Sequence, residues 1–160
     1  MNEVALVGDI LEEYASRGVF RAFSRHESGG QRAQYRLLWH RNQLFQFTYN
    51  GARKRLRISC VLPQVPAKSA MYREFKQWLK AKADDSLPDH RRCERTKVAL
   101  KTYNRDGDIA LTLQLLDDDL EYGVRKLLAL VNEIYLDFLS SGLYFDWLID
   151  TFDLDPDNPY

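Results

Sequence analysis

The segment LTLQLLDDDLEYGVRKLL, from Leu111 to Leu128, changes its hydrophobic period halfway along its length. Before the three aspartates, leucines occupy every second position, which is typical of a strand with one buried face. After the aspartates, apolar residues recur every third or fourth position, which is typical of a helix with one buried side. The segment therefore predicts a strand and a helix that meet at the aspartates.

The three consecutive aspartates, Asp117, Asp118 and Asp119, are also the group of residues in the sequence that most resembles a functional site. Asp118 and Glu121 have the spacing of a capping box, in which side-chain oxygens accept hydrogen bonds from backbone N–H groups of the first helical turn. The alternative is a metal site, but no further ligands that converge on the aspartates can be identified. We therefore predict that Asp118 caps the helix.

The same periodicities predict the other elements. Helices are expected at residues 3–17, 67–82 and 120–139, and strands at 19–25, 33–40, 43–49, 54–61, 96–103 and 108–116. Short turns between successive strands imply an antiparallel meander, and Asn50-Gly51 is the strongest signal for a two-residue hairpin turn. The prediction is a single α+β domain over residues 1–160, with an antiparallel sheet and helices packed mainly on one face. Residues 141–160 form an aromatic, acidic C-terminal extension of this domain.

Two features bear on the compartment. The N-terminal segment has no basic leader, and the longest later apolar run, 127–131, is far shorter than the ~20 residues that cross a bilayer. Cys60 and Cys93 fit neither a disulfide framework nor a CxxC metal site, so we expect two reduced thiols. Cys60 is expected on the same buried strand face as Ile58. Together these features predict a cytoplasmic protein.

Catalytic and cofactor motifs are absent from the sequence. It has no GxSxG, GxGxxG or GxxxxGK[ST] motif, and His26, His40 and His90 are scattered over separate elements. The segment HRRC offers two metal ligands where zinc needs three or four, and DLDPDNPY lacks the glycine and glutamate of a calcium loop. We therefore expect no enzyme, cofactor or metal. An active site assembled from distant residues would escape this kind of search.

The charge is divided along the chain. Residues 1–116 hold 21 Lys and Arg against 12 Asp and Glu, whereas residues 117–160 hold 2 against 11. The formal net charge is zero. Because the two parts can neutralise each other within one fold, little field remains to attract phosphates. We therefore expect no specific nucleic-acid binding.

A basic sheet face supports the alternative function, which is single-stranded nucleic-acid binding. Residues 31–62 hold seven Lys and Arg and no acid. Cations and aromatic residues partly alternate there, as in sheets that bind phosphates and stack bases; they are Arg36, Arg53, Lys54, Arg55 and Arg57 with Tyr35, Trp39, Phe45 and Phe47. A basic solvent face opposite an apolar core face is, however, an ordinary outcome for an antiparallel sheet.

The middle helix and the C-terminal extension carry more apolar surface than one small sheet needs to bury. Interface cores are enriched in aromatic residues and methionine, so these side chains predict a homodimer or a complex with another protein. The candidate partner-binding residues are Met71, Phe75, Trp78, Leu79, Tyr144, Phe145, Trp147 and Phe152. Trp147 is the preferred anchor because Asp146 and Asp150 would form a polar rim around it. The alternative is that Trp147 fills the end of the chain's own core.

The order helix, antiparallel strands, helix, hairpin and long helix resembles that of the class I type III secretion chaperones and the related YbjN-like proteins. The chain has one strand more before the middle helix than that pattern, and it adds the aromatic extension. The resemblance implies a small, non-enzymatic α+β domain, often dimeric, that holds another polypeptide on apolar surfaces. It implies no catalytic residue. We therefore predict a chaperone-like, protein-binding or regulatory module.

Overall fold

The computed structural model describes residues 3–27, 30–84, 86–88 and 92–139. Its helices are α1 (Glu3–Ser16), α2 (Ala70–Ala81) and α3 (Leu120–Glu133), and α3 continues into a π-helical turn (Ile134–Phe138). Its strands are β1 (Ala22–His26), β2 (Arg32–Leu38), β3 (Leu44–Asn50), β4 (Arg55–Leu62), β5 (Val98–Arg105) and β6 (Asp108–Leu115). These elements confirm the predicted α+β fold, with boundaries shifted by a few residues. None of the described helices has the length and apolar character that a membrane crossing requires.

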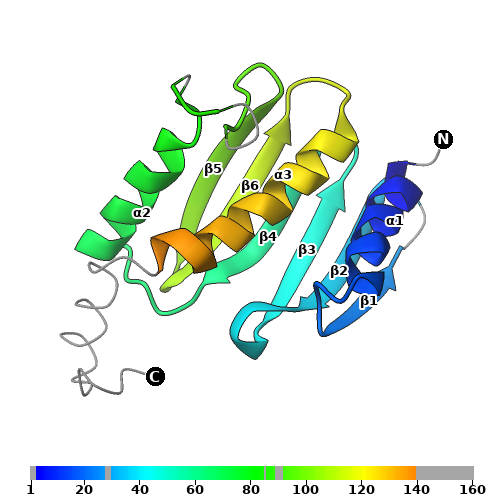
Figure 1. Cartoon of the computed structure of the whole chain (residues 1–160), viewed down its shortest axis with the longest axis horizontal. Coiled ribbons are helices and arrows are strands. Elements are labelled where there is room, and N and C mark those ends of the chain that lie inside the picture. The colour runs from blue at the N-terminus through cyan, green and yellow to red at the C-terminus, as the bar shows by residue number, and fades with distance from the viewer. Residues whose placement is uncertain (1–2, 28–29, 85, 89–91, 140–160) are drawn as a thin grey trace.

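The strands form one antiparallel sheet in the order β1-β2-β3-β4-β6-β5 (Figure 1). After β4, the chain passes through α2 before it returns to the sheet as β5. The following strand, β6, then pairs with both β5 and β4. This order leaves β1 and β5 as the two edges, with α2 beside β5.

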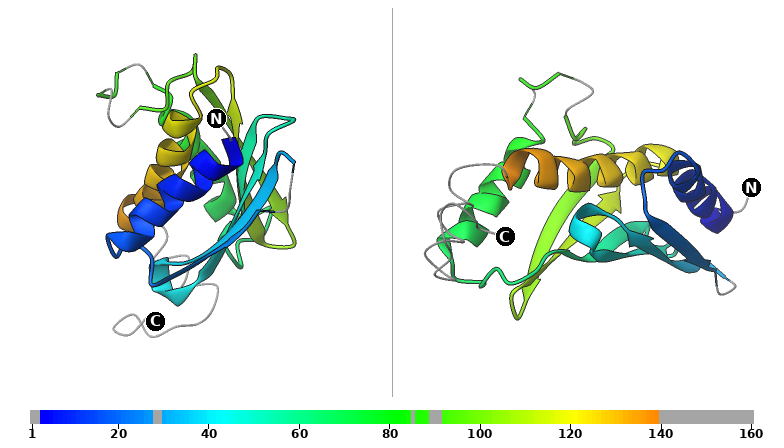
Figure 2. Two further views of the ribbon diagram at one scale, coloured as in Figure 1. Left: turned by 90° about the vertical axis from the view of Figure 1, so that its right-hand side faces the viewer. Right: turned by 60° about the horizontal axis from the view of Figure 1, so that its bottom comes forward.

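The helices cover one face of the sheet (Figure 2). α1 contacts β1 and β2, and α3 crosses β4 and β6. Burial alternates along the strands as this packing requires, since Tyr35 and Leu37 are fully buried while Arg36 between them is exposed. The prediction that the helices pack mainly on one face is confirmed.

Gly123 allows α3 to lie close to the sheet. A Cβ atom at this position would lie 2.5 Å from Cδ2 of Leu115 and 3.3 Å from Cδ1 of Leu56. A side chain here would therefore push the helix away from β4 and β6. The glycine has a packing role, although it lies inside a helix, where glycine is intrinsically unfavourable.

Tyr135 fills the space where β3 and β4 separate. Only Phe47 to Asn50 of β3 pair with β4, and only Arg55 to Ile58 of β4 pair with β3. The start of β3 and the end of β4 therefore do not pair with each other. The Tyr135 hydroxyl donates a hydrogen bond of 2.6 Å to the carbonyl of Val61 and accepts one of 3.0 Å from Gln43. The Tyr135 side chain thus replaces some of the hydrogen bonds that β3 and β4 do not make with each other here.

Two details of the predicted strands are wrong. The β3–β4 hairpin lies where it was predicted, but its turn spans 51–54, and Lys54 has the positive φ of 53°. Gly51 is needed because a Cβ there would lie 2.9 Å from Cβ of Gln31. Cys60 is half-buried rather than part of the core, because the pairing register shifts between Ile58 and Leu62. Burial and the nearby Asp108 raise the pKa of its thiol to about 11.

We predict that Tyr135→Phe lowers the free energy of unfolding by about 1 to 3 kcal/mol, because it leaves the buried Val61 carbonyl without its donor. Urea denaturation checks this value. Tyr103→Phe is the matched control, since Tyr103 is 61% exposed, and it should leave the midpoint unchanged. Equal midpoints for both variants would show that the Tyr135 bond does not support the sheet.

Candidate functional site

The candidate site is a groove between α2 and the edge strand β5. It has a volume of about 370 Å³. We call it the α2–β5 groove; its lining residues are Lys76, Leu79, Lys80 and Ala83 on the helix side, Val98, Ala99, Leu100 and Thr102 on β5, and Cys93 and Arg95 in the connection. Figure 1 shows α2 running beside β5, so the groove lies along a free edge of the sheet.

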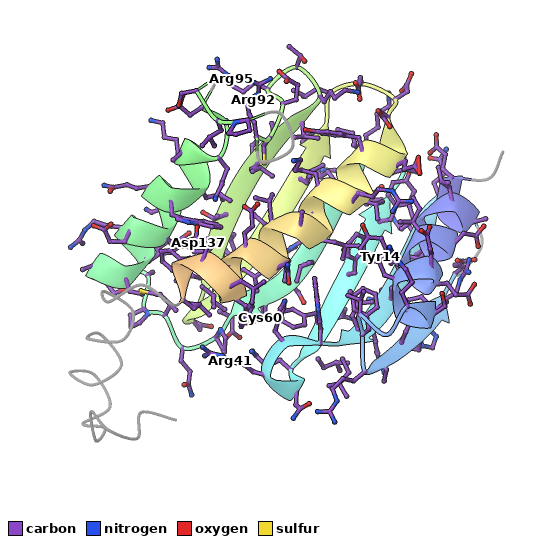
Figure 3. The ribbon with its side chains drawn as sticks, in the orientation of Figure 1. Tyr14, Arg41, Cys60, Arg92, Arg95 and Asp137 are labelled. Carbon is purple, nitrogen blue, oxygen red and sulfur yellow. The ribbon has the colours of Figure 1, made fainter. Side chains whose placement is uncertain are left out.

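The floor of the groove is apolar and its rim is cationic. Leu79, Cys93 and Val98 are 6%, 1% and 4% exposed and form the floor. Lys76 and Lys80 lie on the exposed side of α2. Arg95 joins them from the segment between α2 and β5 (Figure 3). No carboxylate is present among the described lining residues, so the groove favours an acidic ligand with apolar groups.

The backbone of β5 offers hydrogen-bonding groups along the groove. Asp106 and Gly107 both have positive φ values, 53° and 96°, and form a two-residue hairpin turn. Arg105 and Asp108 are therefore a hydrogen-bonded pair, and along β5 such pairs alternate with residues whose N–H and C=O groups point away from β6. Leu100 and Thr102 are two of the residues whose backbone groups point away. Within the described chain, no hydrogen bond from outside the sheet reaches their backbone groups.

The thiol that lines the groove is a poor catalytic group. Cys93 is the one cysteine among the described lining residues, and burial raises the pKa of its thiol to about 11. A thiol in this state is mostly protonated at neutral pH and is a poor nucleophile. No imidazole or carboxylate of the described lining is present to activate it.

Most of the predicted partner-binding residues of α2 serve the chain's own core. Met71, Phe75 and Leu79 are 1%, 0% and 6% exposed. Trp78 is half-buried, and its ring lies between Phe75 and Phe138. Tyr144, Phe145, Trp147 and Phe152 lie outside the described residues. The side of α2 that stays exposed is therefore its cationic groove side rather than its apolar stripe.

Lys82 explains why Trp78 is held inward. Lys82 is 7% exposed, although lysine side chains usually lie in solvent. Its Nζ atom lies 3.1 Å from Oε2 of Glu133, 3.8 Å from Oδ2 of Asp137 and 4.4 Å from the centre of the Trp78 ring. Trp78 also donates from Nε1 to Asp137, which faces α2 from the end of α3 (Figure 3). These charges fix α2 against α3.

The aspartate triplet caps α3, but the capping residue is Asp119 rather than Asp118. Asp119 accepts a hydrogen bond of 3.1 Å from the Tyr122 N–H. Asp118 instead pairs with Lys54 at 2.7 Å. Lys97 lies 3.2 Å from Asp117 and 2.9 Å from Asp119, so the lysines select which acid reaches the helix. The hydrogen bond from Lys97 and that from the Tyr122 N–H lower the pKa of Asp119.

The sheet face opposite the helices is the second candidate surface, which we call the open face. Its strand positions carry the exposed cations Arg32, Arg36, Arg55, Arg57, Lys101 and Arg105. The aromatic residues that alternate with the arginines in sequence point into the core, since Tyr35, Phe45 and Phe47 are at most 1% exposed. Lys54 belongs to the β3–β4 turn. The structure thus separates the predicted cations from their aromatic neighbours.

No family model, no curated protein and no solved structure matches this chain.

We predict that Asp119→Ala destabilises the protein by about 0.5 to 2 kcal/mol, the usual cost of losing an N-cap. Asp118→Ala is the matched control and should cost less, because an exposed ion pair contributes little. Thermal or urea unfolding of both variants checks the order. A larger loss for Asp118→Ala would mean that the Lys54 pair, and not the cap, secures this junction.

The same carboxylate makes stability depend on pH. Because folding lowers the pKa of Asp119, its stabilisation is complete above the unfolded value of about 3.9 and is lost as the pH falls through the folded value. Asp119→Asn keeps a good cap but removes the charge that pairs with Lys97. We therefore expect this variant to lose less stability than the parent on acidification below about pH 4, measured by urea unfolding at a series of pH values.

Proposed function

We propose that the protein is a non-enzymatic, chaperone-like binding module that holds an extended segment of another polypeptide in the α2–β5 groove. The single observation that carries this proposal is the position of the groove, which places an apolar floor and a cationic rim beside an unpaired strand edge. An extended peptide bound there adds a strand to the sheet, a common mode of peptide recognition.

The groove specifies the chemistry of the bound segment. Backbone groups of Leu100 and Thr102 pair with its main chain, which supplies affinity for any extended sequence. Every second side chain of the segment then faces the floor of Leu79 and Val98, which favours apolar residues. Acidic residues are favoured close to the cationic rim. The expected partner segment is therefore extended and contains both acidic and apolar residues.

A second copy of this chain is a poor occupant of the groove. β5 carries Lys101 and Arg105 and no acid. Pairing β5 with itself would bring these like charges and the lysines of two α2 helices together, which is unfavourable across a strand pair. The charge of the edge therefore favours a different, acidic polypeptide. The resemblance to secretion chaperones and YbjN-like proteins points to the same class of partner.

Homodimerisation is proposed at a different place, through the aromatic C-terminal extension with Trp147 as its anchor. Light scattering over micromolar concentrations tests it, and we expect the mass of a dimer for the parent and a lower mass for Trp147→Ala. A parent that stays monomeric, with a Trp147→Ala variant that only loses thermal stability, would place Trp147 in the chain's own core instead.

The binding proposal predicts the outcome of a peptide selection. Random twelve-residue peptides displayed on phage are selected against the immobilised parent protein. We expect enriched peptides to combine acidic residues with alternating apolar residues, and the strongest of them to shift the amide resonances of Leu100 and Thr102 in an NMR titration. The physical reason is that the main chain pairs with β5 while the acids meet the cationic rim.

Charge reversal provides the matched comparison. Lys76→Glu with Lys80→Glu should weaken binding of the selected peptide at least tenfold, because opposite charges at the rim become like charges. Lys68→Glu with Arg73→Glu makes the same change in charge at exposed positions outside the groove lining and should leave the affinity close to that of the parent. Equal weakening by both pairs, or peptide shifts confined to other strands, would refute the groove as the binding site.

A further inference from the structure

The cations of the open face lack the carboxylate partners that many of the described cations on the helix side have. Carboxylates pair with cations on the helix side and in the turns; these cations are Arg17, Arg25, Lys54, Lys82, Arg92, Lys97 and Arg125. Within the described residues, no ion pair reaches Arg32, Arg36, Arg55 or Arg57. Among the described residues, the neutralisation between the basic and acidic parts of the chain therefore does not extend to this face.

Acids are nearly missing from the open face itself. Among its described strand positions, Asp108 is the one acid, and it lies at the start of β6. Among the described acids after residue 116, Asp119 lies at the start of α3 and Glu133 at its end, on the helix side of the sheet. A chain of zero net charge thus presents one face with a positive potential.

The strand register arranges these cations at regular spacings. Arg57 and Lys101 lie on one row across the sheet, separated by Thr112, so their backbones are about 10 Å apart. Arg32 and Arg55 are separated in the same way by Asn50. Along β4, Arg55 and Arg57 are about 7 Å apart. Cations thus recur in both directions over the sheet.

Polar, uncharged side chains fill many of the positions between the cations. A hollow of about 460 Å³ over β1, β2 and β3 is lined by His26, Arg32, Gln34, Thr48 and Asn50, among others. Amide and hydroxyl groups of this kind both donate and accept hydrogen bonds. They can meet the edges of unpaired bases while the arginines contact phosphates.

We propose that the open face binds single-stranded nucleic acid, with its phosphates on the arginines and its bases over the polar positions. Arginine matches phosphate with two parallel hydrogen bonds, and all but one of the cations on this face are arginines. Its large exposed apolar side chains, Leu44 and Tyr103, lie apart on β3 and β5, so the face lacks the continuous apolar centre of a protein interface and the apolar side of a membrane-binding surface. This surface is separate from the α2–β5 groove, so neither proposal depends on the other.

The same geometry sets the character of the binding. Tyr35, Phe45 and Phe47 are committed to the core, so stacking contributes little, and Tyr103 is the exposed aromatic residue on this face. Binding then rests mainly on phosphate contacts, which makes it tolerant of sequence and strongly dependent on salt. With about five phosphate contacts, the affinity should fall about a hundredfold as the salt concentration rises fourfold.

Fluorescence polarisation with a labelled single-stranded oligothymidine and a labelled oligouridine of about 20 nucleotides tests the proposal. Titrations of the full chain at several salt concentrations give the slope of log affinity against log salt. We expect Arg55→Ala with Arg57→Ala to weaken binding at every salt concentration and to reduce the slope by about 1.4. Lys68→Ala with Arg73→Ala removes the same charge from exposed positions outside both surfaces and should change neither quantity appreciably.

The alternatives give different results. Equal weakening by the Lys68 and Arg73 pair would show that overall charge, and not the open face, attracts the oligonucleotide. Displacement of the oligonucleotide by polyglutamate of equal charge, at equal concentration, would assign the face to acidic protein segments. The absence of binding at low salt would also overturn the proposal. Retained binding of the selected groove peptide by the Arg55 and Arg57 variant would confirm that the two surfaces are independent.

Discussion

The packing of every helix on a single apolar face is the constraint on which the rest of this structure depends. Side chains alternate between faces along each strand, and most of the apolar members point toward the helices. The sheet must therefore be covered there, and α3 covers its centre closely because Gly123 has no side chain to hold it away from Leu115. The opposite face, left without a covering layer in the described chain, carries the exposed arginines.

The same constraint creates the edge groove. Because α2 must also bury its apolar side against the core, it lies on the helix side of the sheet, next to the strand that follows it. The Lys82 cluster and Trp78 fix α2 toward α3, and the opposite side of α2, with Lys76 and Lys80, is left facing β5. An apolar floor, a cationic rim and a free strand edge thus meet at one place.

The spacing of apolar residues along the sequence was sufficient to predict the helices and strands and the packing of the helices on one face of the sheet. It predicted the change from β6 to α3 because alternate leucines give way to a helical stripe at the aspartates. It missed features that depend on distant residues. Lys54 and Lys97, far along the chain from the triplet, decide that Asp119 rather than Asp118 caps the helix. A shift in strand register displaces Cys60 from the core, although its sequence neighbours predict burial.

The candidate surfaces were only partly predictable for the same reason. The sequence shows the cations of residues 31–62, but only the register shows that their aromatic neighbours point away from them. The groove combines α2, β5 and the connection between them, and no local pattern reveals that β5 lies at the edge of the sheet. The apolar stripe of α2 suggested binding to another protein. In the structure it packs against the end of α3, which lies far away in sequence.

Amide hydrogen exchange along β5 tests most directly whether this edge is open. In the register of the β5–β6 hairpin, Lys101 and Tyr103 donate to β6, while Leu100 and Thr102 turn their N–H groups away from the sheet. NMR-detected exchange on the full chain should therefore show an alternating pattern, with rapid exchange at Leu100 and Thr102 and slow exchange at Lys101 and Tyr103. Uniformly slow exchange at all four residues would mean that something already covers the edge, and would contradict the groove as a free binding site.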